Sequence, residues 1–165
     1  MITKKQKQKY QQMTKNQLNK ELNNVCISGN LEIVRYLLTS PDLKEHADIH
    51  TNDTDTSLQY ASAFGHLGLV KYLLTSPDLK EYGHIHSEND KLFISACSDK
   101  NKKMLEYFIF DYMIEKTEHI ENHLIEHDYK NDYEDILMMF EKRDLEEKLQ
   151  KKLQNDNINY HKMKI

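Results

Sequence analysis

The sequence contains no tryptophan, only two prolines and only four glycines among its 165 residues. A β-sandwich needs many turns built on Gly and Pro, so this composition disfavours that fold and favours helices. The two cysteines cannot form a disulfide framework, and neither belongs to a Cys-x-x-Cys or Cys/His metal motif. The chain is therefore predicted to be mostly α-helical, without a structural disulfide or a cysteine-bound metal.

Long apolar runs and a strong charge of one sign are also absent. No apolar stretch approaches the length of a membrane span, and no apolar run follows the first lysines, so neither a membrane span nor a secretory signal is expected. The formal net charge of −4 is too small to indicate a nucleic-acid-binding protein or an acidic disordered chain. We expect one compact domain in the cytoplasm, or inside a host cell if the protein is exported.

An internal repeat is the strongest signal in the sequence. The segment Leu38–Glu45 returns unchanged as Leu74–Glu81, a shift of 36 residues. Upstream, Gly29–Leu38 matches Gly65–Leu74 in the same register, and Met104–Ile109 is a weaker third copy that lies one residue closer. A fixed period of about 20 to 50 residues indicates a stacked repeat fold.

Each copy is predicted to contain two short helices and a polar loop. Leu58 belongs to the first helix, which should end at Gly65 because glycine reaches positive φ without steric cost. Ser76–Pro77 is predicted to begin one extra helical turn, and the polar stretch 50–56 is predicted to project as a finger loop. The second helix should bury one apolar side, formed by Val70, Leu73 and Leu74 in one copy and by Leu37 and Leu38 in the preceding copy.

These units resemble the ankyrin repeat. The family pattern of Thr-Pro-Leu-His, two small residues and Gly-His appears as TSLQYASAFGH over Thr56–His66, and the Val-x-x-Leu-Leu pattern follows at Val70–Leu74. Ala47–His50 is similar to the Ala-Asp-Val-Asn that precedes the finger. Ser57 and Gln59 depart from the family's Pro and His, and a longer loop after the second helix accounts for a period above the family norm of about 33 residues.

The resemblance implies an all-α ankyrin-repeat solenoid of stacked helix-turn-helix units with finger loops and divergent helical caps. We expect a basic flexible tail over residues 1–14, about three repeats over 15–110 and a divergent helical C-terminal cap over 111–165. The flanking helices are expected over Lys15–Cys26, with Leu18, Leu22 and Val25 inward, over Ile114–His127, and over Asp132–Leu153, with Leu145, Leu149 and Leu153 on one stripe.

Three histidines are the best candidates for metal chemistry. His119, His123 and His127 would lie on one face of a helix, where His pairs at i, i+4 can bind zinc. They lack the glutamate of a His-Glu-x-x-His motif, and their apolar neighbours favour a solvated helix edge, so we expect no metal and no cofactor. Cys26 and Cys97 hold equivalent repeat positions and are expected to pack separately in the core.

Two other groups have competing interpretations. Tyr36, Tyr72 and Tyr107 recur at one repeat position, which favours packing between repeats over an exposed aromatic strip on the convex side. The lysines of the first twenty residues could contact phosphates, although solvated charges are the simpler interpretation: Lys4, Lys5, Lys7, Lys9, Lys15 and Lys20. No phosphate loop, nucleophile elbow or paired-carboxylate motif is visible, so we do not expect an enzyme.

The resemblance also implies a function and a surface. Ankyrin repeats usually bind partner proteins with the finger tips and with the first-helix residues before Gly-His, which here include one large apolar residue, Phe64. The acidic residues nearby suggest a partner with a basic patch. The candidate partner-binding residues are Ile27, Ser28, Asn52, Asp53, Thr54, Asp55, Ala63, Phe64, Asn89, Asp90, Lys91, Ser98 and Asp99.

The function is therefore predicted to be that of a protein-binding module or adaptor, with a monomer favoured. Two alternatives stay open: a protein that contacts nucleic acid or metal through the basic tail or the three histidines, and a structural fragment of a longer array. The abundance of Lys, Asn, Ile and Tyr resembles repeat proteins of large DNA viruses and host-associated bacteria, which leaves an effector role open as well.

Overall fold

The computed structural model describes residues 2–50, 55–98, 101–126 and 130–162. These residues form helices joined by turns and extended connections, and the described ranges contain no strand. The backbone divides into two compact units, Met1–Met104 and Leu105–Ile165. The all-α class is confirmed, and the first unit ends at Met104 rather than at the expected boundary of residue 110.

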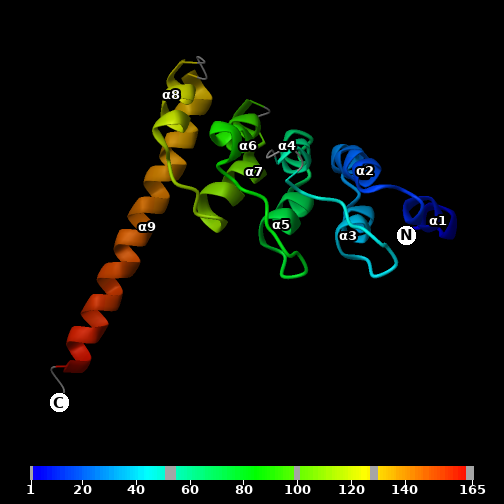
Figure 1. The fold of residues 1–165 in the computed structure, drawn as a ribbon. Helices are drawn as coiled ribbons and strands as arrows, with labels where there is room; N and C mark the ends of the chain where they lie inside the picture. Colours follow the sequence, from blue (N-terminus) through cyan, green and yellow to red (C-terminus); the bar gives the residue numbers. More distant parts are fainter. Residues whose placement is uncertain (1, 51–54, 99–100, 127–129, 163–165) are drawn as a thin grey trace. The chain divides into compact units, whose positions relative to one another are not determined.

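The first unit is built from helix pairs that repeat along the chain. The first helices of successive pairs are α2 (Lys15–Ser28), α4 (Thr56–Ala63) and α6 (Ser87–Ser98), and they form one row in Figure 1. The second helices α3 (Leu31–Thr39) and α5 (Leu67–Thr75) lie beneath α2 and α4. Helix α2 contacts α3 and α4, and α4 in turn contacts α5 and α6. The short helix α7 (Lys102–Glu106) follows α6 and crosses the division between the two units.

Capping side chains and glycines set the helix ends, as predicted for Gly65. Thr14 and Gln17 form a reciprocal capping box that begins α2, and Gly29 ends it with a positive φ of 73°. Gly65 has a φ of 74° at the equivalent turn. The next repeat also packs tightly here, because the His66 ring occupies the space that a Cβ on Gly29 would need, and His66 Nε2 lies 2.8 Å from the Ile27 carbonyl oxygen.

The core lies at the seams that the period predicts. Leu18, Leu22 and Val25 of α2 are buried, and so are Leu37, Val70, Leu73 and Leu74 of the second helices. Leu38 is only half-buried because it borders an open groove beside residues 40–50, which we call the first finger connection; residues 76–86 form the second. Buried polar links also join the repeats, such as the hydrogen bond that Ser57 Oγ donates to Asn23 Oδ1 at 2.6 Å.

The expected flexible tail contains a helix instead. Helix α1 (Lys4–Gln11) begins with a capping box formed by Thr3 and Gln6. Its one aromatic residue, Tyr10, is buried, and its ring centroid lies 6.0 Å from that of Tyr36 on α3. The tail prediction is wrong over α1 because it weighed the low apolar content and overlooked both the cap and the buried ring.

The expected extra helical turn after each second helix is also wrong. Helices α3 and α5 end at Thr39 and Thr75, and the serine that follows each one has an extended backbone. The Ser40 hydroxyl accepts a hydrogen bond from the Asp42 amide at 3.2 Å, and Ser76 makes the same contact at 3.4 Å. Such a serine turn satisfies the backbone locally, so the following proline does not start a helix.

After the end of α7, the described part of the second unit contains three helical elements. These are the π-helical segment η2 (Tyr107–Asp111), α8 (Glu118–Glu126) and α9 (Lys130–Lys162). Helix α8 begins four residues later than Ile114, because the Thr117 hydroxyl caps it by accepting the Ile120 amide at 3.2 Å. Ile136 and Phe140 of α9 are buried, and Arg143 donates to the Ile114 carbonyl oxygen at 2.5 Å.

The leucines predicted to form one stripe on α9 are exposed to solvent, whereas most of the other predicted apolar positions are buried. Leu145, Leu149 and Leu153 are respectively 68%, 55% and 49% exposed. Ion pairs at i, i+4 accompany the stripe, such as Lys151 with Glu147. The expected extent of this helix, Asp132–Leu153, lies within the observed one.

Replacement of Leu73 by alanine tests the repeat register. Leu73 is fully buried between helices, so Leu73→Ala should cost about 2 to 5 kcal/mol of unfolding free energy through lost contacts and a residual cavity. The exposed Leu145→Ala is the control and should change the melting temperature little. Equal melting temperatures for the two variants would contradict the register.

Candidate functional site

The exposed side of α2, α4 and α6 carries the most apolar part of the predicted surface. We call this surface the first-helix face and define it by Asn24, Ile27, Ser28, Tyr60, Ala63, Phe64 and Lys91. On α4, Phe64 is 56% exposed and Tyr60, one turn before it, is 37% exposed. Tyr60 is not among the predicted partner-binding residues, although its spacing of four residues from Phe64 places both on one helix side.

The candidate partner-binding residues fall into three groups. Ser28, Ala63, Phe64, Asn89 and Lys91 are exposed, and Ile27 is half-buried. Asp55 and Asp90 are buried, with 1% and 4% exposure, so their placement on an accessible finger tip is wrong. The remaining candidates lie outside the described residues or, for Ser98, have a side chain that is not described: Asn52, Asp53, Thr54, Ser98 and Asp99.

Asp55 is buried because it ties two fingers to the start of α4. Its Oδ1 lies 2.6 Å from His50 Nδ1, and its Oδ2 accepts a hydrogen bond from the His84 backbone amide at 2.7 Å. A carboxylate with two such donors is satisfied without water. Asp55 therefore acts as a structural link between consecutive repeats.

The same link occurs at the equivalent position of the preceding repeat. Asn19, 36 residues before Asp55, accepts a hydrogen bond from the Asp48 backbone amide at 2.8 Å, and Asp48 lies 36 residues before His84. In the following repeat, Asp90 pairs with His86. We call Asn19, Asp55 and Asp90 the finger-joint residues, because each connects the start of a first helix to a finger.

The third finger joint has an unusual backbone. Glu88, Asn89 and Asp90 all have positive φ angles, between 48° and 59°, where side chains other than glycine are uncommon. This connection is one residue shorter than the equivalent stretch from His50 to Asp55. A hydrogen bond from Lys91, 2.9 Å away, stabilises the Glu88 carboxylate and lowers its pKa.

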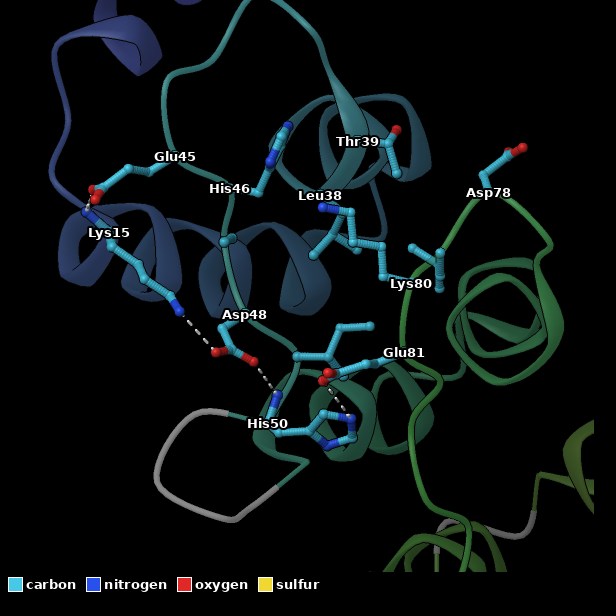
Figure 2. Close-up of a pocket in the computed structure, with 13 residues that line it drawn as sticks. Lys15, Leu38, Thr39, Glu45, His46, Asp48, His50, Asp78, Lys80 and Glu81 are labelled. Carbon is cyan, nitrogen blue, oxygen red and sulfur yellow. Dashed lines mark hydrogen bonds and ion pairs between the residues drawn. The ribbon is translucent and has the colours of Figure 1, made fainter.

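A groove of about 490 Å³ lies between the two finger connections (Figure 2). Its charged side chains largely pair with one another. Lys15 Nζ lies 3.0 Å from Asp48 Oδ2, and this contact holds the pKa of Asp48 below its usual range. His50 Nε2 lies 3.9 Å from Glu81 Oε2 on the opposite wall. The first pair ties the first connection to α2, and the second joins the two connections.

Both cysteines pack in the core, as predicted. Cys26 and Cys97 are buried, and the loss of solvation raises the pKa of each thiol to about 12. A hydrogen bond with Ser57 offsets only part of this effect at Cys26. Because the thiolate is the nucleophilic form, neither side chain suits covalent catalysis in the folded protein.

The tyrosine ladder is interior rather than a binding strip. Tyr36 and Tyr72 are buried in the first unit, and Tyr107 is buried in the second. The Arg35 guanidinium of the preceding repeat lies over the Tyr72 ring, 4.9 Å from its centroid, and makes a cation–π contact with it. The interpretation as packing is confirmed, and the exposed aromatic strip is wrong.

Three of the six lysines in the basic N-terminal segment pair with acidic residues. Lys7 pairs with Asp42 at 3.3 Å, Lys9 with Glu21 at 3.2 Å and Lys15 with Asp48 at 3.0 Å. Charges that already have acidic partners are less available to nucleic-acid phosphates, since binding would have to break these pairs. The argument for nucleic acid from an unpaired basic tail therefore fails for these three lysines.

The structure brings ligating side chains together at a different place from the predicted histidine stripe. His119 is exposed and His123 is half-buried on α8, while His127 lies outside the described residues. In the part of the chain that the structure describes, the group with metal-ligand spacing is His50, Asp55 and His84. The repeat register is the signal that could have found it, because it places each finger beside the next first helix.

The cysteines provide a test of core burial. With thiol pKa values of about 12, the folded chain should react with iodoacetamide at pH 8 far more slowly than free cysteine does, because thiolate is scarce and access is blocked. In denaturant both thiols should be alkylated, as counted by intact-mass spectrometry. Rapid modification of the folded chain would show that the cysteines are not in the core.

Substitution of Asp55 tests the finger joint. Asp55→Ala should lower the unfolding free energy by about 1 to 3 kcal/mol in chelator-containing buffer, because it leaves the His84 amide without its acceptor. Asp55→Asn should cost less, because Asn19 performs the same role in the preceding repeat. The exposed Asp78→Ala is the control, and a loss as large as that of Asp55→Ala would contradict the assignment. Urea unfolding followed by circular dichroism measures all three variants.

Comparison with known proteins identifies the repeat segment. The family model described as "Ankyrin repeats (3 copies)" matches residues 12–82, which include α2 to α5, the first finger connection and part of the second. No curated protein and no solved structure has significant similarity to the chain. Within the described ranges, no helix combines the length and apolar character needed to cross a membrane. The capped helix pairs, the fingers and the family match agree, and residues 12–82 belong to the ankyrin-repeat family.

Proposed function

We propose that the chain is a protein-binding module that contacts its partner through the first-helix face, with Tyr60 and Phe64 as the anchor. Ankyrin repeats are in general protein–protein interaction modules, which supports this class of function. The observation that carries the choice of surface is the exposure of two aromatic side chains one helical turn apart. Aromatic side chains are enriched among the residues that dominate binding energy at protein interfaces.

The surroundings of this aromatic pair make it accessible. Ala63 lies beside Phe64 on α4 and is exposed, and Ser28 is the exposed residue at the Phe64 position of the preceding repeat. Small neighbours leave room for a partner side chain to pack against the rings. Since the pair is held on a helix that contacts α2, α5 and α6, little ordering is needed when a partner binds.

Charge is proposed to play a secondary part. Two of the acidic residues that suggested a basic partner, Asp55 and Asp90, are buried in the finger joints. On α6, the exposed Lys91 already pairs with Glu88 at 2.9 Å. We therefore propose an apolar anchor, and any preference for a basic patch would have to come from Asp53 and Asp99, which lie outside the described residues.

Affinity capture tests this surface with a matched control. The immobilised full chain should retain a stoichiometric protein from a cell extract, and the double variant Tyr60→Ala/Phe64→Ala should lose it. Tyr82→Ala should retain it, because Tyr82 is an exposed tyrosine on the connection after α5 rather than on the first-helix face. Both variants should keep the wild-type melting temperature, since these rings are not in the core.

Kinetics with the purified partner sharpen the test. Loss of apolar contact should act mainly on the dissociation rate, so Phe64→Ala should dissociate about tenfold or more faster with a nearly unchanged association rate. Surface plasmon resonance measures both rates. Equal effects of Phe64→Ala and Tyr82→Ala, or no effect of either, would place the binding surface elsewhere.

A further inference from the structure

Three side chains with nitrogen and oxygen ligands meet at the second finger joint. His50 ends one finger connection, Asp55 begins α4, and His84 belongs to the next finger connection. One ligand atom from each lies within 4.8 Å of the other two. His50 Nδ1 lies 2.6 Å from Asp55 Oδ1, and His84 Nδ1 lies 3.7 Å from Asp55 Oδ2. Both histidines thus place the same ring nitrogen near one carboxylate.

This spacing is close to that of a tetrahedral metal site. Zinc binds histidine nitrogen and carboxylate oxygen at about 2.0 to 2.2 Å, which places neighbouring ligand atoms about 3.3 Å apart. Because His50 contacts Oδ1 and His84 contacts Oδ2 of Asp55, the His50 contact would have to widen and the His84 ring would have to move inward for one ion to bind all three side chains. His84 can make its adjustment readily, because its side chain is 74% exposed. Asp55 is held in place by the His84 backbone amide.

The groups around the ligands also fit metal binding. A histidine that binds metal through one ring nitrogen usually donates its other N–H to a carboxylate or carbonyl, and a ligating carboxylate is itself usually hydrogen-bonded. Glu81 Oε2 lies 3.9 Å from His50 Nε2, on the far side of the ring from Asp55. If His50 binds metal through Nδ1, its proton moves to Nε2, where Glu81 can accept a hydrogen bond. The Asp55 carboxylate already accepts one from the His84 amide at 2.7 Å.

We propose that His50, Asp55 and His84 bind one divalent transition-metal ion, and that the ion is Zn²⁺. Two imidazoles and one carboxylate suit zinc, whereas Mg²⁺ and Ca²⁺ prefer all-oxygen sites. Three protein ligands leave a fourth position for water, and the exposed His84 side chain places that position near solvent. The proposal does not depend on the first-helix face or on the proposed partner.

The metal would join two consecutive repeats. His50 and Asp55 flank one finger, while His84 comes from the finger connection that follows α5. A bound ion would replace the proton in the His50–Asp55 hydrogen bond and add a bond to His84 across the repeat interface. Since an ion that binds only the folded state stabilises it by mass action, zinc should raise the melting temperature in a concentration-dependent way.

The following repeat supplies a matched control. His86 and Asp90 form a similar His–Asp pair, and His86 lies 36 residues after His50. In the described ranges, the group with metal-ligand spacing includes neither of these two residues. The comparison of the two joints therefore tests whether the second histidine, His84, is needed for metal binding.

A zinc titration against a chromophoric chelator tests the site in the untagged full-length chain. The wild type should bind one Zn²⁺ at micromolar concentration or tighter, and His84→Ala and Asp55→Asn should each weaken binding at least tenfold. His86→Ala should bind within about twofold of wild type. Co²⁺ should give the intense visible absorption of a tetrahedral site in the wild type and lose it in His84→Ala. Excess Mg²⁺ or Ca²⁺ should not compete.

The result can also overturn the proposal. Failure of the wild type to bind a stoichiometric ion would show that the His50–Asp55 contact is only a hydrogen bond between repeats. Undiminished binding by His84→Ala would place any zinc site elsewhere, and an equal loss in His86→Ala would indicate unspecific binding. His84→Ala decides the outcome even if Asp55→Asn unfolds, because the His84 side chain is exposed and its backbone amide is unchanged.

Discussion

The fingers of the first unit depend on one interaction: a polar side chain at the start of a first helix accepts a hydrogen bond from the finger that follows. Asn19 binds the Asp48 amide in this way, and Asp55 binds the His84 amide one repeat later. Each finger connection buries apolar residues, such as Ile49 and Ile85, and this hydrogen bond satisfies its backbone and fixes its direction. The position of each finger connection, and of the side chains that it carries, therefore depends on the first helix of the same repeat.

The interior could be predicted from the sequence because it follows a period. Leu18, Leu73 and Cys26 recur at spacings that place them at helix seams, and the structure buries all three. The finger joints could not be predicted in the same way. By its sequence Asp55 resembles a polar turn residue, and its burial becomes favourable through the His50 ring and the backbone amide of His84, which lies 29 positions later. Helix α1 was not predicted for a related reason: Tyr10 packs against Tyr36, which belongs to a different segment of the chain.

The candidate surface and the candidate metal cluster were predictable to different degrees. Phe64 could be placed on an exposed helix side because the family pattern fixes its register relative to Gly65. The histidines chosen from helical spacing, His119 and His123, are on one helix but gain no third ligand among the described residues. His50 and His84 are 34 residues apart in the sequence, and only the stacking of repeats brings their rings to a centroid distance of 4.7 Å.

The identical segments Leu38–Glu45 and Leu74–Glu81 have a genetic consequence. A crossover between their coding sequences would delete a block of 36 residues and join Glu45 to Tyr82 without altering the local sequence on either side. The shortened chain would present the His84 amide to Asn19 in place of the Asp48 amide, so the remaining joint would stay closed. The deleted block carries both Tyr60 and Phe64. Recombination can thus add or remove the exposed aromatic pair as a unit while the rest of the array keeps its connections.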